Sequence, residues 1–206
     1  MIEVEQISNK ITEILNTLSP HFLYVKLGGS RSLPFIKNPH DYDIIIICEK
    51  EEDRFICSKL FHNTYDSKEL RFTYGLDFHI ITLEYENFFV NSIYPYLIQE
   101  TDIIYSTIKD FLPKNRDINY MLANEATIIA KYKKRIHSEK LMHEGVKYKH
   151  KFWYYAYTAI CIFKNKSFNL TEEQINNINM LHDRKDETWP SRVALIDTMI
   201  QELESW

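Results

Sequence analysis

Residues 27–48 read LGGSRSLPFIKNPHDYDIIIIC, a stretch that joins a glycine pair to a pair of carboxylates at the head of an apolar run. Gly28 and Gly29 are two of only four glycines in the chain. A strand that turns sharply and lets phosphate oxygens approach its backbone has no room for a Cβ, and the successive N–H groups of such a turn bind anions. A Gly-Gly-Ser tripeptide alone also marks ordinary turns, so its meaning depends on the residues after it.

Two carboxylates come after the glycine turn. Asp41 and Asp43 bracket Tyr42 at the start of the isoleucine run. Side chains two residues apart on a strand share a face, so we expect both carboxylates to converge on one spot. Close carboxylates repel each other, and a hard divalent cation such as Mg²⁺ or Mn²⁺ relieves that repulsion. The alternative is that the two aspartates are turn residues after the Pro-His dipeptide.

A third carboxylate lies in the later apolar run FTYGLDFHIITL, residues 72–83. Burying Asp77 there without a partner would be costly, and a metal would be such a partner. Two-metal phosphoryl-transfer sites need carboxylates that converge from neighbouring strands. His79 shares the face of Asp77 by the same alternation, but the sequence assigns it no role, because a lone histidine is more often structural than a ligand.

The flanking patterns predict an α+β fold: a small mixed sheet with helices, followed by a C-terminal helical bundle. Apolar spacing predicts an amphipathic helix over 3–18, ended by Pro20, and helical structure over 84–100 and from about 115 to the end. The predicted strands are 21–27, 41–48, which suits burial on both faces, 72–83 and 102–106. We place a domain boundary between residues 112 and 113, giving domains 1–112 and 113–206.

Composition limits the class of protein. The chain has 206 residues, of which 45% are hydrophobic, and a formal net charge of −4. It has three scattered cysteines without metal-ligand spacing, and no apolar run of the ~20 residues that span a bilayer. We therefore expect a soluble, cytoplasmic protein with no membrane partner.

One segment is strongly basic. Residues 131–151, KYKKRIHSEKLMHEGVKYKHK, hold eight Lys or Arg against two Glu. Such a segment is either a solvated helix face or a surface that binds phosphate, and the sequence leaves both alternatives open.

The elements together resemble the polymerase-β-like nucleotidyltransferase superfamily, and most closely its small bacterial and phage-type branch. The residues that carry the resemblance are Leu27-Gly28-Gly29-Ser30, the pair Asp41 and Asp43 at the head of a strand, and Asp77 in a later strand. It covers only about residues 20–85. One departure is the Leu33-Pro34 dipeptide, where that branch often has another glycine.

The resemblance implies a nucleotidyltransferase palm over residues 1–112. It implies that Asp41 and Asp43 hold two Mg²⁺ or Mn²⁺ ions, and that Asp77 completes the shell of the first and helps deprotonate the acceptor hydroxyl. Gly29 and Ser30 would bind the β- and γ-phosphates of an NTP. We include their neighbours Gly28 and Arg31 in the predicted nucleotide-binding set.

In the family, helices after the palm often lend a cation to the triphosphate and a ring to the base. The spacing of Lys147, Lys151 and Tyr154 would place them on one helical face. The alternative is that neighbouring residues of 152–160 face a core and the lysines face water. Further along, Thr171 and Gln174 predict a capping box at the start of a helix.

The residues and the resemblance support two classes of function. The first is an enzyme that transfers NMP from an NTP, with ATP favoured, to a hydroxyl of RNA, a protein side chain or a small molecule. The second is a catalytically silent module that binds a nucleotide or RNA and retains the fold. The three carboxylates favour the enzyme, because a binding module has no need for converging charges. A phosphohydrolase with the same metals would leave the glycine turn without a role.

Overall fold

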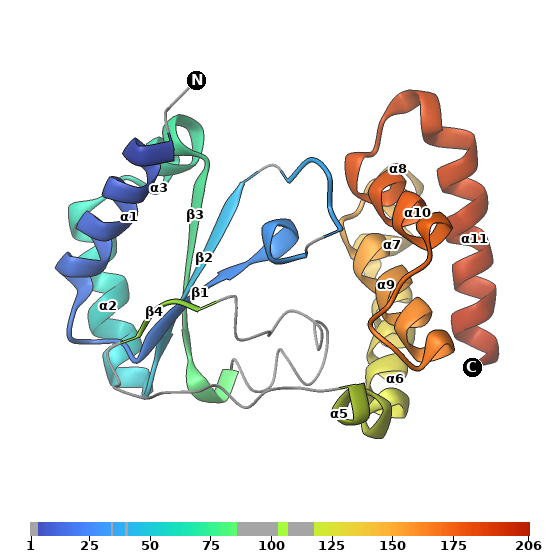
Figure 1. Ribbon diagram of the computed structural model, residues 1–206, viewed down its shortest axis with the longest axis horizontal. Coiled ribbons are helices and arrows are strands. Elements are labelled where there is room, and N and C mark those ends of the chain that lie inside the picture. Colours follow the sequence, from blue (N-terminus) through green and yellow to red (C-terminus); the bar gives the residue numbers. More distant parts are fainter. Residues whose placement is uncertain (1–3, 34, 40, 86–102, 107–117) are drawn as a thin grey trace. The chain divides into compact units, whose positions relative to one another are not determined.

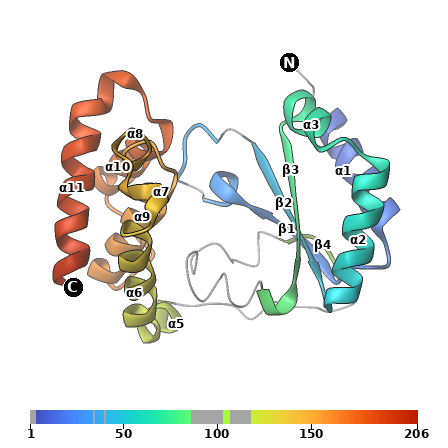
Figure 2. The same ribbon diagram turned by 180° about the vertical axis from the view of Figure 1, so that it is seen from behind.

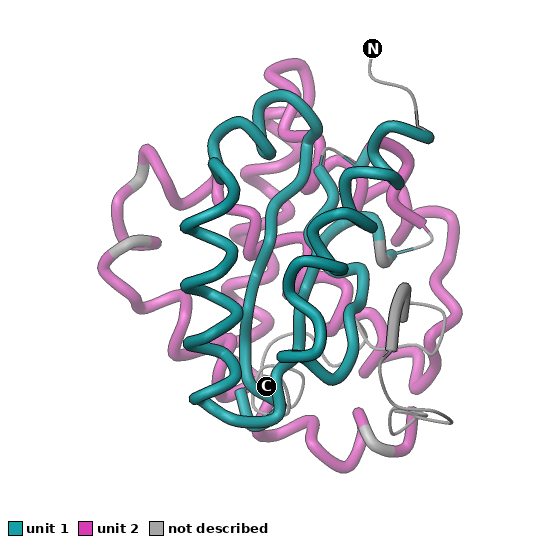
Figure 3. The backbone as a smooth tube through the Cα atoms, turned by 90° about the vertical axis from the view of Figure 1, so that its left-hand side faces the viewer, with its two compact units in different colours: residues 1–34, 39–88, 97–115 teal, residues 35–38, 89–96, 116–206 magenta. Residues whose placement is uncertain are grey.

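The structure is a computed structural model that describes residues 4–33, 35–39, 41–85, 103–106 and 118–206. The chain divides into two compact units, shown in Figure 3. Unit 1 comprises residues 1–34, 39–88 and 97–115, and unit 2 comprises residues 35–38, 89–96 and 116–206. The predicted boundary between residues 112 and 113 lies outside the described residues.

The described residues of unit 1 form a four-stranded sheet of order β3-β2-β1-β4, seen in Figure 1 and from behind in Figure 2. The strands are β1 (Tyr24–Gly28), β2 (Tyr42–Cys48), β3 (Leu76–Thr82) and β4 (Ile103–Ser106). The helical elements are α1 (Val4–Leu18), η1 (Gly29–Ser32), α2 (Glu51–Thr64), α3 (Ser67–Glu69) and η2 (Leu70–Tyr74).

The sheet is mixed. β1 pairs antiparallel with both β2 and β4, and β2 pairs parallel with β3. The parallel pair requires a crossover, which α2, α3 and η2 supply between the two strands. Since residues 118–206 supply further helices, the protein belongs to the α+β class.

The two faces of the sheet differ in what they carry. Helices α1 and α2 pack on the face that bears Val25, Ile44 and Ile46, all buried in one apolar cluster with Leu18 and Phe61 of the helices (Figure 1). Side chains alternate along each strand, so the residues between these apolar positions face the other way. The opposite face therefore belongs to a second set of residues, which includes the predicted site.

Several predicted elements of unit 1 are confirmed. The first helix ends at Leu18, and β2 and β4 fall within the predicted strands 41–48 and 102–106. β1 overlaps the predicted strand 21–27 but ends one residue later, at Gly28. Burial on both faces holds for the second half of β2, where Ile46 and Ile47 are both buried. The helix predicted over 84–100 lies, from residue 86 onward, outside the described residues.

The third predicted strand began too early. The structure places residues 72–74 in the helical element η2, and β3 starts at Leu76. The helical segment begins at Asp66, whose carboxylate accepts hydrogen bonds from the N–H groups of Lys68 and Glu69, and it ends at Gly75 with φ 67°. Phe72 is 84% exposed, so the aromatic residue that suggested a strand has no place in the sheet.

Unit 2 is helical over residues 118–206, as the apolar spacing predicted. Its elements are α5 (Ile118–Ala123), α6 (Glu125–Ile136), α7 (Glu139–Met142), α8 (Glu144–Lys147), α9 (Phe152–Asn165), α10 (Glu172–Asp183), η4 (Asp186–Thr188) and α11 (Trp189–Ser205). Its core forms around α9, where Trp153 and Ala156 are fully buried. The predicted capping box is confirmed, with Thr171 and Gln174 bonding reciprocally at the start of α10.

The short segment Phe35–Asn38 also belongs to unit 2. The side-chain oxygen of Asn179 accepts from the Lys37 N–H at 2.8 Å, and its amide nitrogen donates to the Phe35 carbonyl at 2.9 Å. Across the described parts of both units, no helix combines the length and the apolar character that a membrane crossing needs.

Candidate active site

The register of the sheet aligns the predicted site residues in one row. Gly28 pairs with Asp43 across the β1–β2 ladder, and Asp43 pairs with Asp77 across the β2–β3 ladder. Paired residues on neighbouring strands point to the same face, so the two aspartates lie side by side on the face opposite α1 and α2. The strand pairing that builds the sheet therefore also assembles the site.

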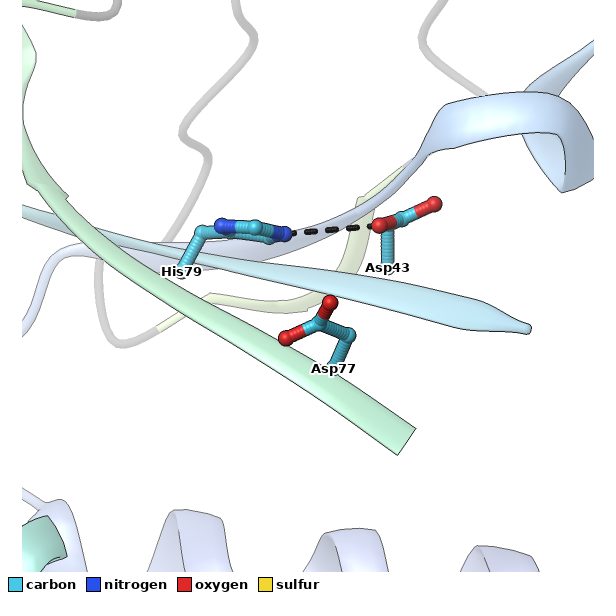
Figure 4. A group of neighbouring side chains, drawn as sticks. All are labelled: Asp43, Asp77 and His79. Atoms are coloured by element: carbon cyan, nitrogen blue, oxygen red, sulfur yellow. Dashed lines mark hydrogen bonds and ion pairs between the residues drawn. The ribbon is translucent and has the colours of Figure 1, made fainter. Parts of the chain in front are cut away.

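Asp43 and Asp77 converge with a third side chain, His79 (Figure 4). One ligand atom from each of the three lies within 4.8 Å of the others. His79 Nε2 lies 3.3 Å from Asp43 Oδ1, within hydrogen-bonding distance. Among the described residues this is the one group of His, Cys, Asp or Glu side chains that meets the spacing of metal ligands.

The group is reachable from solvent. The side chains of Asp43, Asp77 and His79 are 20%, 32% and 48% exposed. Arg71 Nη1 lies 4.0 Å from Asp77 Oδ2, so one cation already stands near the carboxylates. Two oxygen donors and one nitrogen donor that open to solvent can bind a divalent ion and leave coordination positions for a substrate.

The neighbouring aspartates shift the pKa of His79. The pKa of His79 is raised above its ordinary value of 6.5, first by the hydrogen bond to Asp43 and further by the charges of Asp77, Asp43 and Asp41, while burial acts in the opposite direction. A site that favours a positive charge on an imidazole also favours a bound cation.

The glycine turn touches this group. Gly29 has φ 63°, a left-handed conformation that L side chains rarely adopt, and it begins the single turn η1. A Cβ at Gly29 would overlap Oδ2 of Asp43 and lie 2.7 Å from its Cγ. The backbone of the turn therefore lies directly against the carboxylate, and only glycine permits that approach.

Gly28 has a related constraint. A Cβ there would lie 3.0 Å from Cγ1 of Ile45 and overlap its Cδ1. Ser30 is buried, with 5% of its surface exposed. The predicted contact of its hydroxyl with a phosphate stays a prediction.

Arg31 contacts Tyr42, the first residue of β2, and Asp41 just before it. The Arg31 guanidinium stacks on the ring of Tyr42, with Cζ 3.7 Å from the ring centroid, and its Nε donates to the Asp41 carbonyl at 3.0 Å. Asp41 precedes β2 by one residue, and its carboxylate is not part of the 4.8 Å group. Its charge still acts on His79, so it lies within electrostatic reach, and its role as a metal ligand stays a prediction.

The predicted helical face of Lys147, Lys151 and Tyr154 is wrong, because the chain leaves the helix between them. α8 ends at Lys147 and α9 begins at Phe152. The break is fixed by hydrogen bonds to its backbone: Trp153 Nε1 donates to the Lys147 carbonyl at 2.6 Å, and the buried Arg192 donates through Nε to the Tyr148 carbonyl at 2.6 Å.

The three residues also have different surroundings. Lys147 Nζ lies 3.5 Å from Asp197 Oδ1, and Lys151 is exposed. Tyr154 is 2% exposed and packs against Tyr155 and His182, so its ring is a core side chain, as the alternative interpretation of this segment expected for its neighbours. Their predicted contact with a nucleotide stays untested.

His79 is the member of the group to which the sequence assigned no role. The signal was present, since His79 follows Asp77 by two residues on one strand and therefore shares its face. What the sequence could not supply was the register that sets β3 beside Asp43.

The close contact at Gly29 can be tested against a matched glycine. Gly75 has a similar φ of 67°, but a Cβ there would meet nothing within 4 Å. G29A and G75A should therefore share a backbone penalty of about 1–2 kcal/mol in the free energy of unfolding. Only G29A should displace the Asp43 carboxylate, and it should weaken Mn²⁺ binding by about tenfold or more, measured by an electron paramagnetic resonance titration. Equal Mn²⁺ affinity in G29A and wild type would contradict the contact.

The coupling of His79 to Asp43 gives a second prediction. In chelator-treated protein, NMR titration should place the His79 pKa above 6.5, and D43N should lower it, whereas D53N on α2 should leave it unchanged. Because the folded-state pKa is raised, this coupling stabilises the fold fully below pH 6.5 and is lost as the pH rises through the raised value. The difference in unfolding free energy between wild type and D43N should shrink over that interval. A His79 pKa that D43N does not change would show that the hydrogen bond is absent in solution.

Comparisons with known proteins give no relative from which a function can be transferred. Neither the family models, nor the curated proteins, nor the solved structures contain a match to the chain. Any function for the site therefore rests on the chemistry of its own residues.

Proposed function

We propose that the protein is a metal-dependent nucleotidyltransferase, which moves an NMP from an NTP to an acceptor hydroxyl and releases pyrophosphate. The observation that carries the proposal is the contact between the Gly29 backbone and the Asp43 carboxylate. In nucleotidyl transfer the ions bind carboxylate and phosphate oxygens at once, so the turn that holds the phosphates must adjoin the metal ligands. A glycine turn used only to reverse the chain needs no carboxylate beside it.

The architecture of unit 1 supports a nucleotidyltransferase palm. The glycine turn follows β1, the first carboxylates stand at the head of β2, and the third stands near the head of β3, the strand next to it. This order along the chain is the one that the resemblance implies. The paired aspartates Asp43 and Asp77 lie on the face that α1 and α2 do not cover.

The donor set fits the implied ions. Asp43 and Asp77 offer the oxygen donors that Mg²⁺ and Mn²⁺ prefer, and both remain open to solvent. Asp41 would share the second ion after a small adjustment of the segment ahead of β2. When bound, the ions supply charge neutralisation for the phosphate oxygens.

The chain's own groups then have separate tasks. The backbone N–H groups of the turn at Gly29 bind the β- and γ-phosphate oxygens, and the missing Cβ lets them approach. The acceptor oxygen forms a bond to the α-phosphorus as the bond from that phosphorus to the bridging oxygen breaks, and pyrophosphate leaves. The proton of the acceptor hydroxyl passes to Asp77. Arg31 keeps Asp41 and Tyr42 in place through its stacking and its hydrogen bond.

The donor substrate is an NTP, with ATP favoured. The acceptor hydroxyl belongs to RNA, a protein side chain or a small molecule. Part of the basic segment is already engaged within unit 2: Lys147 pairs with Asp197, and Lys133 donates to the Glu204 carbonyl at 3.4 Å. A role for this segment toward a nucleotide or RNA would have to compete with these contacts.

The test uses each α-labelled NTP with Mg²⁺ or Mn²⁺, first with purified protein and then with a cell lysate that supplies acceptors. Wild type should transfer label from at least one NTP. D43N and D77N should each reduce transfer by at least about a hundredfold, or about 2.7 kcal/mol in barrier, because both remove a metal-binding charge. D53N, on α2 of the same unit, should transfer as wild type does.

Calorimetry of NTP binding with Mn²⁺ makes the result independent of the acceptor. Wild type should bind an NTP in the presence of the metal, and D43N should bind it more weakly. The proposal fails if D43N retains both NTP affinity and label transfer.

A further inference from the structure

We infer that His79 is a nitrogen ligand of the metal held by Asp43 and Asp77, and that it makes the site prefer Mn²⁺ to Mg²⁺. The inference rests on the proposed function for the presence of a divalent ion at this site. It adds His79 to the implied ligands Asp41, Asp43 and Asp77, and it specifies which of the two ions the site prefers.

The spacing of the donor atoms fits one ion. Ligands that bind at about 2.1 Å lie roughly 3 Å apart when adjacent and about 4.2 Å apart when opposite in an octahedral shell. His79 Nε2 and Asp43 Oδ1 lie 3.3 Å apart, close to the adjacent value. All three donor atoms fall within 4.8 Å of one another, so small side-chain rotations bring them to a common centre.

The three donors come from two neighbouring strands of the sheet. Asp43 lies on β2, while Asp77 and His79 lie on β3, two residues apart and on one face. Figure 4 shows the imidazole directed at the Asp43 carboxylate, with the Asp77 carboxylate beside it. Strands hold side-chain directions more narrowly than loops do, so this convergence is a property of the fold.

The surroundings of His79 argue against a purely structural role. Its side chain is 48% exposed, so it contributes little to a core. The carboxylates already have a cation nearby in Arg71, which lies 4.0 Å from Asp77, so balancing charge does not require an imidazole. Once a metal displaces the proton of Nε2, what an imidazole adds to two carboxylates is a neutral nitrogen donor.

A nitrogen donor changes the choice of ion. Mg²⁺ is bound almost entirely through oxygen, whereas imidazole is a good ligand for transition metals. Two carboxylates and one imidazole still leave three positions of a six-coordinate ion for phosphate oxygens and water. Mn²⁺ accepts both donor types in this geometry and binds carboxylates and phosphates well, so of the two ions that the proposed function allows it fits the set better than Mg²⁺ does.

The experiment uses the full chain and Mn²⁺ alone as the probe. Electron spin-echo envelope modulation of bound Mn²⁺ should show coupling to a ¹⁴N nucleus in wild type. H79Q should lose this coupling, while H62Q, which changes an exposed histidine of α2 in the same unit, should keep it. Because His79 is half exposed, H79Q should retain the fold, and circular dichroism and the melting temperature check this directly.

Affinities supply the second readout. H79Q should bind Mn²⁺ about tenfold more weakly than wild type, and its affinity for Mg²⁺, measured by competition, should change much less. H62Q should match wild type for both ions.

The outcomes separate this inference from the proposed function. Mn²⁺ bound without nitrogen coupling in wild type, or coupling that persists in H79Q, overturns the role of His79 even if nucleotidyl transfer is observed. Equal loss of Mg²⁺ and Mn²⁺ affinity in H79Q overturns the selectivity. If wild type binds no Mn²⁺, the inference falls, and transfer of label with Mg²⁺ then decides whether the proposed function survives.

Discussion

The candidate site depends on one close approach, that of the Gly29 backbone to the carboxylate of Asp43. Gly29 adopts φ 63°, and a Cβ there would overlap Asp43 Oδ2. Both conditions exclude other residues, the first through backbone strain and the second through steric overlap. The turn after β1 and the head of β2 are consequently in direct contact, with the backbone of Gly29 on one side and the carboxylate of Asp43 on the other. A ligand that carries both negative charge and bound cations fits such a junction.

The same strand pairing serves stability and chemistry on opposite faces. Ile44 and Ile46 of β2 pack with α1 and α2 in the apolar core, and the alternate position, Asp43, faces the other way beside Asp77. Because the core fixes the register, a one-residue slip of β2 would turn Asp43 toward α1 and α2 and away from Asp77. The apolar packing therefore holds the acidic side chains in place, although packing alone would not select for acidic residues at these positions.

The sequence predicted the parts of the site that depend on local pattern. Alternation along a strand was enough to place Asp43 at the head of β2 and Asp77 on β3, and to show that His79 shares the face of Asp77. It overextended the strand into residues 72–74, because aromatic and β-branched residues suggested a strand where Asp66 and Gly75 delimit a helical segment. It also treated residues 147–154 as one helix, since the side chains that hold the break open, Trp153 and Arg192, act across the tertiary structure. The sequence assigned no role to His79, because it does not show that β3 lies beside β2 and brings His79 to Asp43. The predicted role of Asp41 as a metal ligand stays a prediction.

The most direct test of the account is a crystal structure with Mn²⁺ and a non-hydrolysable NTP analogue, with anomalous data collected at the manganese absorption edge. We expect an anomalous peak about 2.1–2.3 Å from carboxylate oxygens of Asp43 and Asp77, with phosphate oxygens of the analogue on the same ion and against the backbone of Gly29. An analogue bound away from the Gly29 turn, or a manganese peak that neither Asp43 nor Asp77 contacts, would contradict it.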